Sequence, residues 1–157
     1  MGSLRWRVRG GRPLVGRVRV SGSKNTAFKA MIAALLADGP SVLENVPDVE
    51  DVRVVARAIE ALGGRATRTA PTTWVIDPRP LAEARLPVGP LERTRASPLL
   101  MVPLMVRFQE AVVPRPGGDR IGRRPLDRVL AGLEMLGARV EERGERLLVR
   151  AIRLRGA

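Results

Sequence analysis

One pattern of predicted secondary structure occurs twice along the chain, and this repeat constrains the fold more than any other feature of the sequence. Four residues recur with identical spacing. They are Glu60, Leu62, Gly63 and Arg65, which match Glu134, Leu136, Gly137 and Arg139. Upstream of them, the apolar segments 26–36 and 41–43 match 97–105 and 111–113. Each unit is therefore expected to fold as helix, strand, helix, strand, strand, which indicates a mixed α/β chain.

Hydrophobic spacing sets the expected bounds of the elements. The first unit predicts helices at 26–36 and 48–62 and strands at 41–44, 65–68 and 73–76. The second unit predicts a helix at 97–105, a strand at 111–113 and a helix that begins at Pro125, with a Pro-rich connector at 78–90 between the units. The helix at 26–36 is apolar on nearly every side, so it is expected to be buried all round.

The stretch ahead of the first unit differs from both repeats. Two runs of alternating apolar and basic residues, 6–9 and 15–20, flank Gly10, Gly11 and Pro13. Alternation with a period of two, broken by turn residues, predicts a pair of strands.

The second unit has four extra residues, and they fall in the loop 114–125, which is rich in Gly and Arg. Loops tolerate insertions that cores do not, so this loop is a candidate functional segment. Backbone N–H groups at the following helix start, together with arginine side chains, favour an anion site. A solvated basic loop would have the same composition.

The chain is strongly basic, with 28 Lys and Arg residues against 16 Asp and Glu and a formal net charge of +12. Nucleic-acid binding is not favoured, because the basic residues are dispersed and Trp6, Phe28, Trp74 and Phe108 are the only aromatic residues. The basic set is almost entirely Arg, with lysine at Lys24 and Lys29 alone. A lysine kept against such a bias is a candidate for chemistry that guanidinium cannot perform.

The 157 residues include no Cys and no His. Disulfides, thiolate chemistry, His–metal sites and Ser–His or Cys–His triads are therefore excluded. The apolar runs are too short to cross a bilayer, and no apolar signal segment follows the basic start, so we expect a soluble cytoplasmic protein without a membrane partner.

A second anion site is expected at Ser21-Gly22-Ser23-Lys24-Asn25, at the start of the first apolar helix. Glycine lets a ligand approach the backbone, and the helix dipole favours negative charge at this end. An ordinary helix cap would use the same residues.

Taken together, an ordered series of motifs carries a family resemblance. The motifs are Ser21–Asn25, Asn45-Val46-Pro47, Asp51-Val52, Arg95-Ala96-Ser97, Pro116–Asp119, Ile121-Gly122, Arg124–Asp127 and Gly132–Ala138. Over nearly its whole length the chain resembles the enolpyruvyl transferases, in particular the UDP-N-acetylglucosamine 1-carboxyvinyltransferase branch. The 3-phosphoshikimate 1-carboxyvinyltransferase branch is similar in its Gly-Ser-Lys entry but usually continues Lys-Ser where this chain has Lys24-Asn25.

The resemblance implies a function and its residues. The enolpyruvyl group of phosphoenolpyruvate would be transferred to the 3-hydroxyl of UDP-N-acetylglucosamine, with no metal and no organic cofactor. Lys24, as a catalytic residue, and Asn25 would contact phosphoenolpyruvate and the reacting sugar. Arg95 would bind in the cleft between the two domains, near the sugar nucleotide or the phosphoenolpyruvate. Arg124 would clamp phosphoenolpyruvate, and Arg124, Pro125, Leu126, Asp127 and Arg128 would border the uridine.

The chain departs from this family's pattern at Asp119. Most members have a cysteine there that acts as general acid, and a minority have aspartate. The resemblance therefore implies Asp119 as the acid, provided that the site raises its pKa. A loop carboxylate paired with neighbouring arginines is the alternative.

The resemblance also implies a domain organisation. Family members have two similar domains of three repeated units each, in an inside-out α/β barrel. Residues 1–21 would belong to the second domain, 22–90 would form the first unit and 91–157 the second. The chain is then expected to be an N-terminal fragment, whose partner would be the missing C-terminal portion or another copy of itself. Alternative functions are a 3-phosphoshikimate 1-carboxyvinyltransferase-like protein, a non-catalytic anion- or nucleotide-binding module, and a basic RNA-binding domain.

Overall fold

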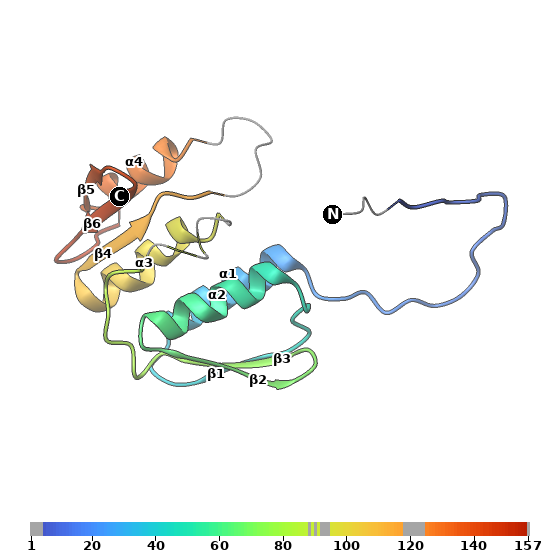
Figure 1. Ribbon diagram of the computed structural model, residues 1–157. Helices are drawn as coiled ribbons and strands as arrows, with labels where there is room; N and C mark the ends of the chain where they lie inside the picture. Colours follow the sequence, from blue (N-terminus) through green and yellow to red (C-terminus); the bar gives the residue numbers. More distant parts are fainter. Residues whose placement is uncertain (1–4, 88, 90, 92–94, 118–124, 157) are drawn as a thin grey trace.

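The computed structural model describes residues 5–87, 89, 91, 95–117 and 125–156. Figure 1 shows an α/β body of helices and two small sheets, with an extended N-terminal segment leading away from it. No helix among the described residues is long and apolar enough to cross a membrane.

The first unit has the predicted order of elements. Its elements are α1 (Lys24–Ala33) with a following 3-10 turn (Ala34–Leu36), β1 (Ser41–Leu43), α2 (Glu50–Ala61), β2 (Arg65–Ala70) and β3 (Thr73–Asp77). Helix α2 begins with Glu50 and Asp51, whose charges favour a helix N-terminus, and Gly63 follows its end with a φ of 88°.

The second unit repeats this order. Its elements are α3 (Ser97–Phe108), β4 (Glu110–Pro114), α4 (Asp127–Met135), β5 (Arg139–Arg143) and β6 (Arg146–Arg150). Helix α4 begins at Asp127 with Leu126 as its N-cap, so the prediction that a helix begins at Pro125 was wrong by two residues. A proline in the first helical position is only a preference, and here the acidic Asp127 occupies the first turn.

The sheets confirm the internal repeat. Each has three antiparallel strands with its third strand in the centre, in the orders β1-β3-β2 and β4-β6-β5. The connector between the units joins the second sheet, because Leu86 N donates to Val112 O at 2.8 Å and Val112 N donates to Ala84 O at 2.9 Å. The units are therefore joined by backbone hydrogen bonds as well as by packing.

The two units share one hydrophobic core. Helix α1 packs against α2 of its own unit and against α3 of the other. Fully buried side chains at this junction are Met31, Leu35, Ile59, Leu100 and Leu104. Arg107 of α3 closes the junction by donating through Nε to Leu35 O at 2.5 Å.

The first helix is not buried all round, contrary to the prediction. Lys29, Ala33 and Leu36 are exposed on one side of α1 and its 3-10 turn. On α3, Val106 is exposed as well. Packing against α2 and α3 covers part of the α1 surface, and the described residues supply no further element over the rest.

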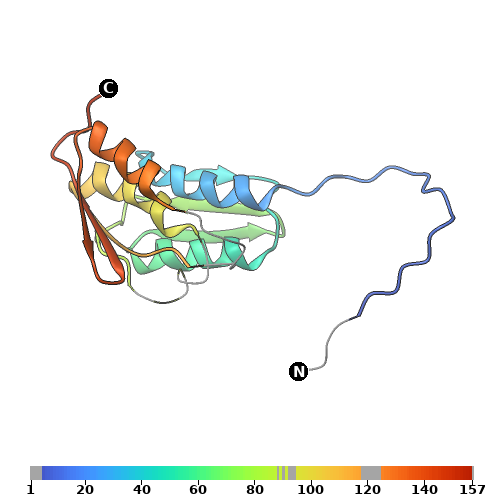
Figure 2. The ribbon, with the colours of Figure 1, turned by 90° about the horizontal axis from the view of Figure 1, so that it is seen from above.

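The predicted strand pair ahead of the first unit is not formed among the described residues. The described residues 5–20 contain no strand, and Figures 1 and 2 show them running away from the body. Trp6 is 88% exposed and Leu14 is fully exposed. Alternation alone does not make a strand, because strands require a hydrogen-bonding neighbour and the described residues provide none here.

Asp77, the last residue of β3, gives a stability prediction. This buried carboxylate accepts hydrogen bonds from Arg79 Nε and Nη2, both at 2.9 Å, and from the Arg79 backbone N at 3.1 Å. The Arg79 hydrogen bond lowers the pKa of Asp77 from 3.8 to about 2. Asp77→Asn should therefore lower the thermal unfolding midpoint at pH 7 by several degrees.

The pH dependence follows from the sign of this shift. A depressed carboxyl pKa stabilises the fold above pH 3.8, and that contribution is lost as the pH falls from 3.8 toward 2. The difference in midpoint between the wild type and Asp77→Asn should shrink over this window. Asp38→Asn, at an exposed aspartate, is the control; a pH-independent difference for Asp77→Asn would contradict the prediction.

Candidate functional site

Among the described residues, the helices α1, α2, α3 and α4 begin at the same end of the molecule, as the two views in Figures 1 and 2 show. The N-terminus of a helix carries a partial positive charge from its unpaired N–H groups. Sequence-predicted site residues lie at three of these starts: Lys24 on α1, Arg95 before α3 and Arg128 on α4. This end of the helix layer is therefore suited to anions.

Lys24 is the first residue of α1. Ser23 caps the helix, since its Oγ accepts a hydrogen bond from Thr26 N at 3.4 Å. Lys24 Nζ lies 3.2 Å from Asp51 Oδ2 of α2, and both side chains are partly exposed. Asn25 is exposed beside it. The structure thus brings Lys24 and Asn25 together at the surface, where a ligand can reach both.

The entry to α1 passes against a turn between β1 and α2. A Cβ on Gly22 would lie 1.7 Å from Asn45 O, so only glycine fits. Asn45 has a φ of 55°, and Val46 N donates to Thr72 O at 2.8 Å. A cavity of about 340 Å³ lies between this turn and the first turns of α1. Gly22 therefore serves close backbone packing at the edge of a cavity.

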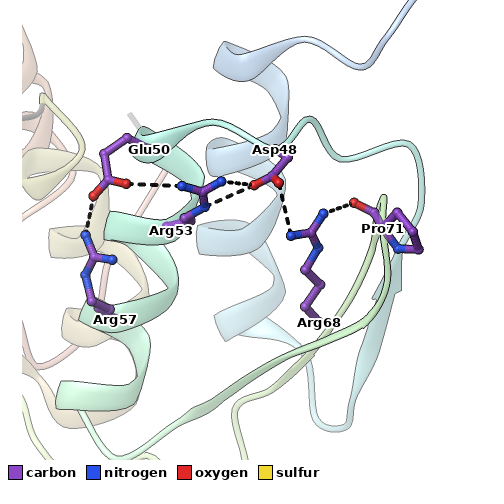
Figure 3. Close-up of polar contacts among 6 residues, drawn as sticks. All are labelled: Asp48, Glu50, Arg53, Arg57, Arg68 and Pro71. Atoms are coloured by element: carbon purple, nitrogen blue, oxygen red, sulfur yellow. Dashed lines mark hydrogen bonds and ion pairs between the residues drawn. The ribbon is translucent and has the colours of Figure 1, made fainter.

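An ion-pair network holds the same turn, as Figure 3 shows. Asp48 Oδ1 accepts from Arg53 Nε at 3.0 Å, and Asp48 Oδ2 accepts from Arg68 Nη1 at 3.1 Å. Arg68 also donates to Pro71 O, and Glu50 accepts from Arg57 Nη2 at 2.6 Å. The hydrogen bond from Arg53 holds the pKa of Asp48 below its usual 3.8, and the charges of Arg53 and Arg68 add to this effect. Asp48 thus joins the turn to α2 and to the β2–β3 hairpin.

The start of α3 carries Arg95 and Ser97. Arg95 is half-buried two residues before the helix, and Ser97 is its first residue. The Ser97 hydroxyl is fully buried and makes no hydrogen bond within the part of the chain that the structure describes. A buried hydroxyl without a partner is uncommon and destabilising.

The start of α4 carries the last group of predicted residues. Pro125, Asp127 and Arg128 are exposed and Leu126 is half-buried. Asp119 and Arg124, the predicted acid and the predicted phosphoenolpyruvate clamp, lie outside the described residues.

Sequence reasoning gave no role to Asp51, Asp48 or Ser97. Asp51 belongs to a motif that the sequence analysis names, but its ion pair with Lys24 was not predicted, because the two residues are distant in sequence. The described residues contain no group of three or more His, Cys, Asp or Glu side chains arranged to hold a metal ion.

Comparison with known proteins gives relatives that carry the names of carboxyvinyltransferases. Residues 8–157 match the family model described as EPSP synthase (3-phosphoshikimate 1-carboxyvinyltransferase). UDP-N-acetylglucosamine 1-carboxyvinyltransferase 3 of Caldanaerobacter subterraneus subsp. tengcongensis is 42% identical over 150 residues, covering 96% of the chain and 36% of the relative. The corresponding Desulfatibacillum aliphaticivorans protein is 43% identical over the same length, with the same coverage.

Two solved structures share the fold. The enolpyruvyl transferase NikO of Streptomyces tendae matches with a TM-score of 0.76 and 26% identity, over 92% of the chain and 32% of NikO. The EPSP synthase of Acinetobacter baumannii matches with a TM-score of 0.60 and 16% identity, over 90% of the chain and 33% of that enzyme. The chain thus spans about a third of the length of the relatives that it matches.

The unpartnered Ser97 hydroxyl gives a second prediction. Ser97→Ala should raise the free energy of unfolding by up to about 1 kcal/mol in chemical denaturation, because it removes a buried polar group that makes no hydrogen bond. Ser23→Ala is the matched control and should lower it by about 1 kcal/mol, because Ser23 caps α1. A Ser97→Ala chain less stable than the wild type would contradict the prediction.

Proposed function

The chain belongs to the enolpyruvyl transferase family represented by EPSP synthase, and on that premise we propose that it forms part of a UDP-N-acetylglucosamine 1-carboxyvinyltransferase. Such an enzyme transfers the enolpyruvyl group of phosphoenolpyruvate to the 3-hydroxyl of UDP-N-acetylglucosamine and supplies peptidoglycan precursors in the cytoplasm. The names of the relatives at about 40% identity support this branch of the family.

The observation that carries the proposal is the common end at which the helices of the described residues begin, with Lys24 exposed at the start of α1. Both substrates are anionic, one through carboxylate and phosphate and the other through a diphosphate. Helix N-termini and fixed cations bind such groups without a metal ion. The charge arrangement therefore fits these substrates.

The residue roles are part of the proposal. Lys24 and Asn25 contact phosphoenolpyruvate and the reacting sugar. Arg95 lies in the cleft between the two domains, near the sugar nucleotide or the phosphoenolpyruvate. Arg124 holds phosphoenolpyruvate, and Pro125, Leu126, Asp127 and Arg128 border the uridine. No metal or organic cofactor takes part.

The reaction requires a proton on carbon and removal of a proton from the alcohol. Protonation of the methylene carbon of phosphoenolpyruvate lets the sugar hydroxyl oxygen bond to the neighbouring carbon. Loss of a methyl proton together with phosphate then restores the double bond in the product. Asp119 is the proposed acid for the first step, and cations around the phosphate stabilise the charge on the leaving group.

The domain assignment also belongs to the proposal, because the chain spans 36% of its relative from Caldanaerobacter. Residues 22–90 and 91–157 are two of the three units of one domain, and residues 1–21 contribute strands to a second domain. The exposed apolar side chains of residues 6–20 support a partner for that segment.

A second candidate has a specific observation in its favour. The matching family model carries the description EPSP synthase, so 3-phosphoshikimate is an alternative acceptor for the enolpyruvyl group. Both acceptors are phosphorylated, and the helix starts suit either one. A binding module without catalysis would use the same charges.

Titration calorimetry on the full chain separates the two acceptors. We expect binding of UDP-N-acetylglucosamine, strengthened by phosphoenolpyruvate, and no binding of shikimate 3-phosphate. Lys24→Arg should weaken binding about tenfold, because a planar guanidinium does not replace a compact ammonium. Lys29→Arg, on the same helix, is the matched control and should bind like the wild type.

Other outcomes are equally decisive. Binding of shikimate 3-phosphate alone would favour the second acceptor. Absence of binding to all three ligands, with tight salt-sensitive binding of RNA, would overturn both proposals.

A further inference from the structure

The contact between Lys24 and Asp51 joins the starts of two neighbouring helices. Lys24 is the first residue of α1 and Asp51 is the second residue of α2, and Nζ and Oδ2 lie 3.2 Å apart. Resting on the proposed function, in which Lys24 binds the substrate anion, we propose that Asp51 is a positioning residue that holds the Lys24 ammonium at the anion-binding end of the helices.

The local electrostatics explain why Lys24 requires such a partner. A cation at a helix N-terminus is repelled by the helix dipole, and the first turn of α1 contains no acidic residue to compensate. Asp51 is in the opposite situation, because a carboxylate in the first turn of α2 is stabilised by that helix. Asp51 therefore supplies, from the neighbouring helix, the negative charge that α1 lacks.

The packing beneath the ion pair fixes the distance between its backbones. Helices α1 and α2 pack against each other, and Val52, next to Asp51, is 1% exposed. Ala27 and Met31 are buried on α1 below Lys24. The anchored helices leave only the side chains of Lys24 and Asp51 free to adjust.

Neighbouring acids on α2 and in the turn before it are engaged elsewhere. Glu50 pairs with Arg57 and Arg53, and Asp48 pairs with Arg53 and Arg68. Of these three acidic residues, Asp51 is the one that pairs with Lys24. Because an ammonium has three N–H donors, one bond to Asp51 leaves two donors for a phosphate or carboxylate. Asp51 can thus orient Lys24 without blocking the ligand.

The chain allows a direct spectroscopic test because its only lysines are Lys24 and Lys29. Reductive methylation of the full chain with ¹³C-formaldehyde keeps the charge and gives each lysine, and the N-terminal amine, a methyl signal in a ¹H–¹³C spectrum. We expect separate signals in the wild type. In Asp51→Asn the Lys24 signal should move toward that of Lys29, whereas Asp51→Glu should keep the separation.

Glu50→Gln is the matched control, because it removes the same charge from the same helical turn without touching Lys24. It should leave both signals in place. An unchanged Lys29 signal and circular dichroism spectrum in all variants show that the fold is retained. A Lys24 signal that does not move in Asp51→Asn overturns the inference.

Calorimetry on the unmodified chain tests the role toward ligand. Asp51→Asn should weaken binding of phosphoenolpyruvate in the presence of UDP-N-acetylglucosamine by roughly two- to fivefold, the range expected for an exposed ion pair. Asp51→Glu should recover most of the loss, and Glu50→Gln should bind like the wild type. Equal or tighter binding by Asp51→Asn overturns the inference.

Failure of the inference differs from failure of the proposed function. If the proposed function fails, the unmodified wild type binds neither ligand in calorimetry, and the inference falls with it. If the inference alone fails, the wild type binds both ligands and Asp51→Asn binds them with the same affinity.

Discussion

The packing of α1 against both α2 and α3 is the constraint on which the rest of the structure depends. Met31 and Leu35 are completely buried in the shared core, and Arg107 joins the end of α3 to the turn after α1. Because the helices run in one direction, this packing places their N-terminal ends at one end of the molecule. The common end of the helix N-termini, which we propose as the anion-binding end, is thus a consequence of how the core is packed.

Carboxylates partly neutralise the positive charge at the end of the molecule where the helices begin. Asp51 faces Lys24, and Asp48 holds the turn under Gly22 through Arg53 and Arg68. The close contact of Gly22 with Asn45 then links this turn to the start of α1. Charge pairs and backbone packing therefore act on the same few residues at the start of α1.

Local patterns predicted most of the secondary structure, and their failures have physical causes. The repeat correctly predicted two units of identical order because hydrophobic spacing reflects which face of each element is buried. The N-terminal runs also alternate, yet the described residues 5–20 form no strand because a strand needs a neighbour. Pro125 predicted a helix start at that residue. The helix instead begins at Asp127, the acidic residue of its first turn.

The sequence by itself determined the repeated α/β units and the family, because these follow from spacing and motifs within short stretches. Only the tertiary structure decided the partners: Asp51 for Lys24, Arg68 for Asp48, and Asn45 under Gly22. These partners are distant in sequence or lie on different elements, so no local pattern records them. They meet because burial of the apolar faces of α1, α2 and the first sheet leaves their polar ends side by side.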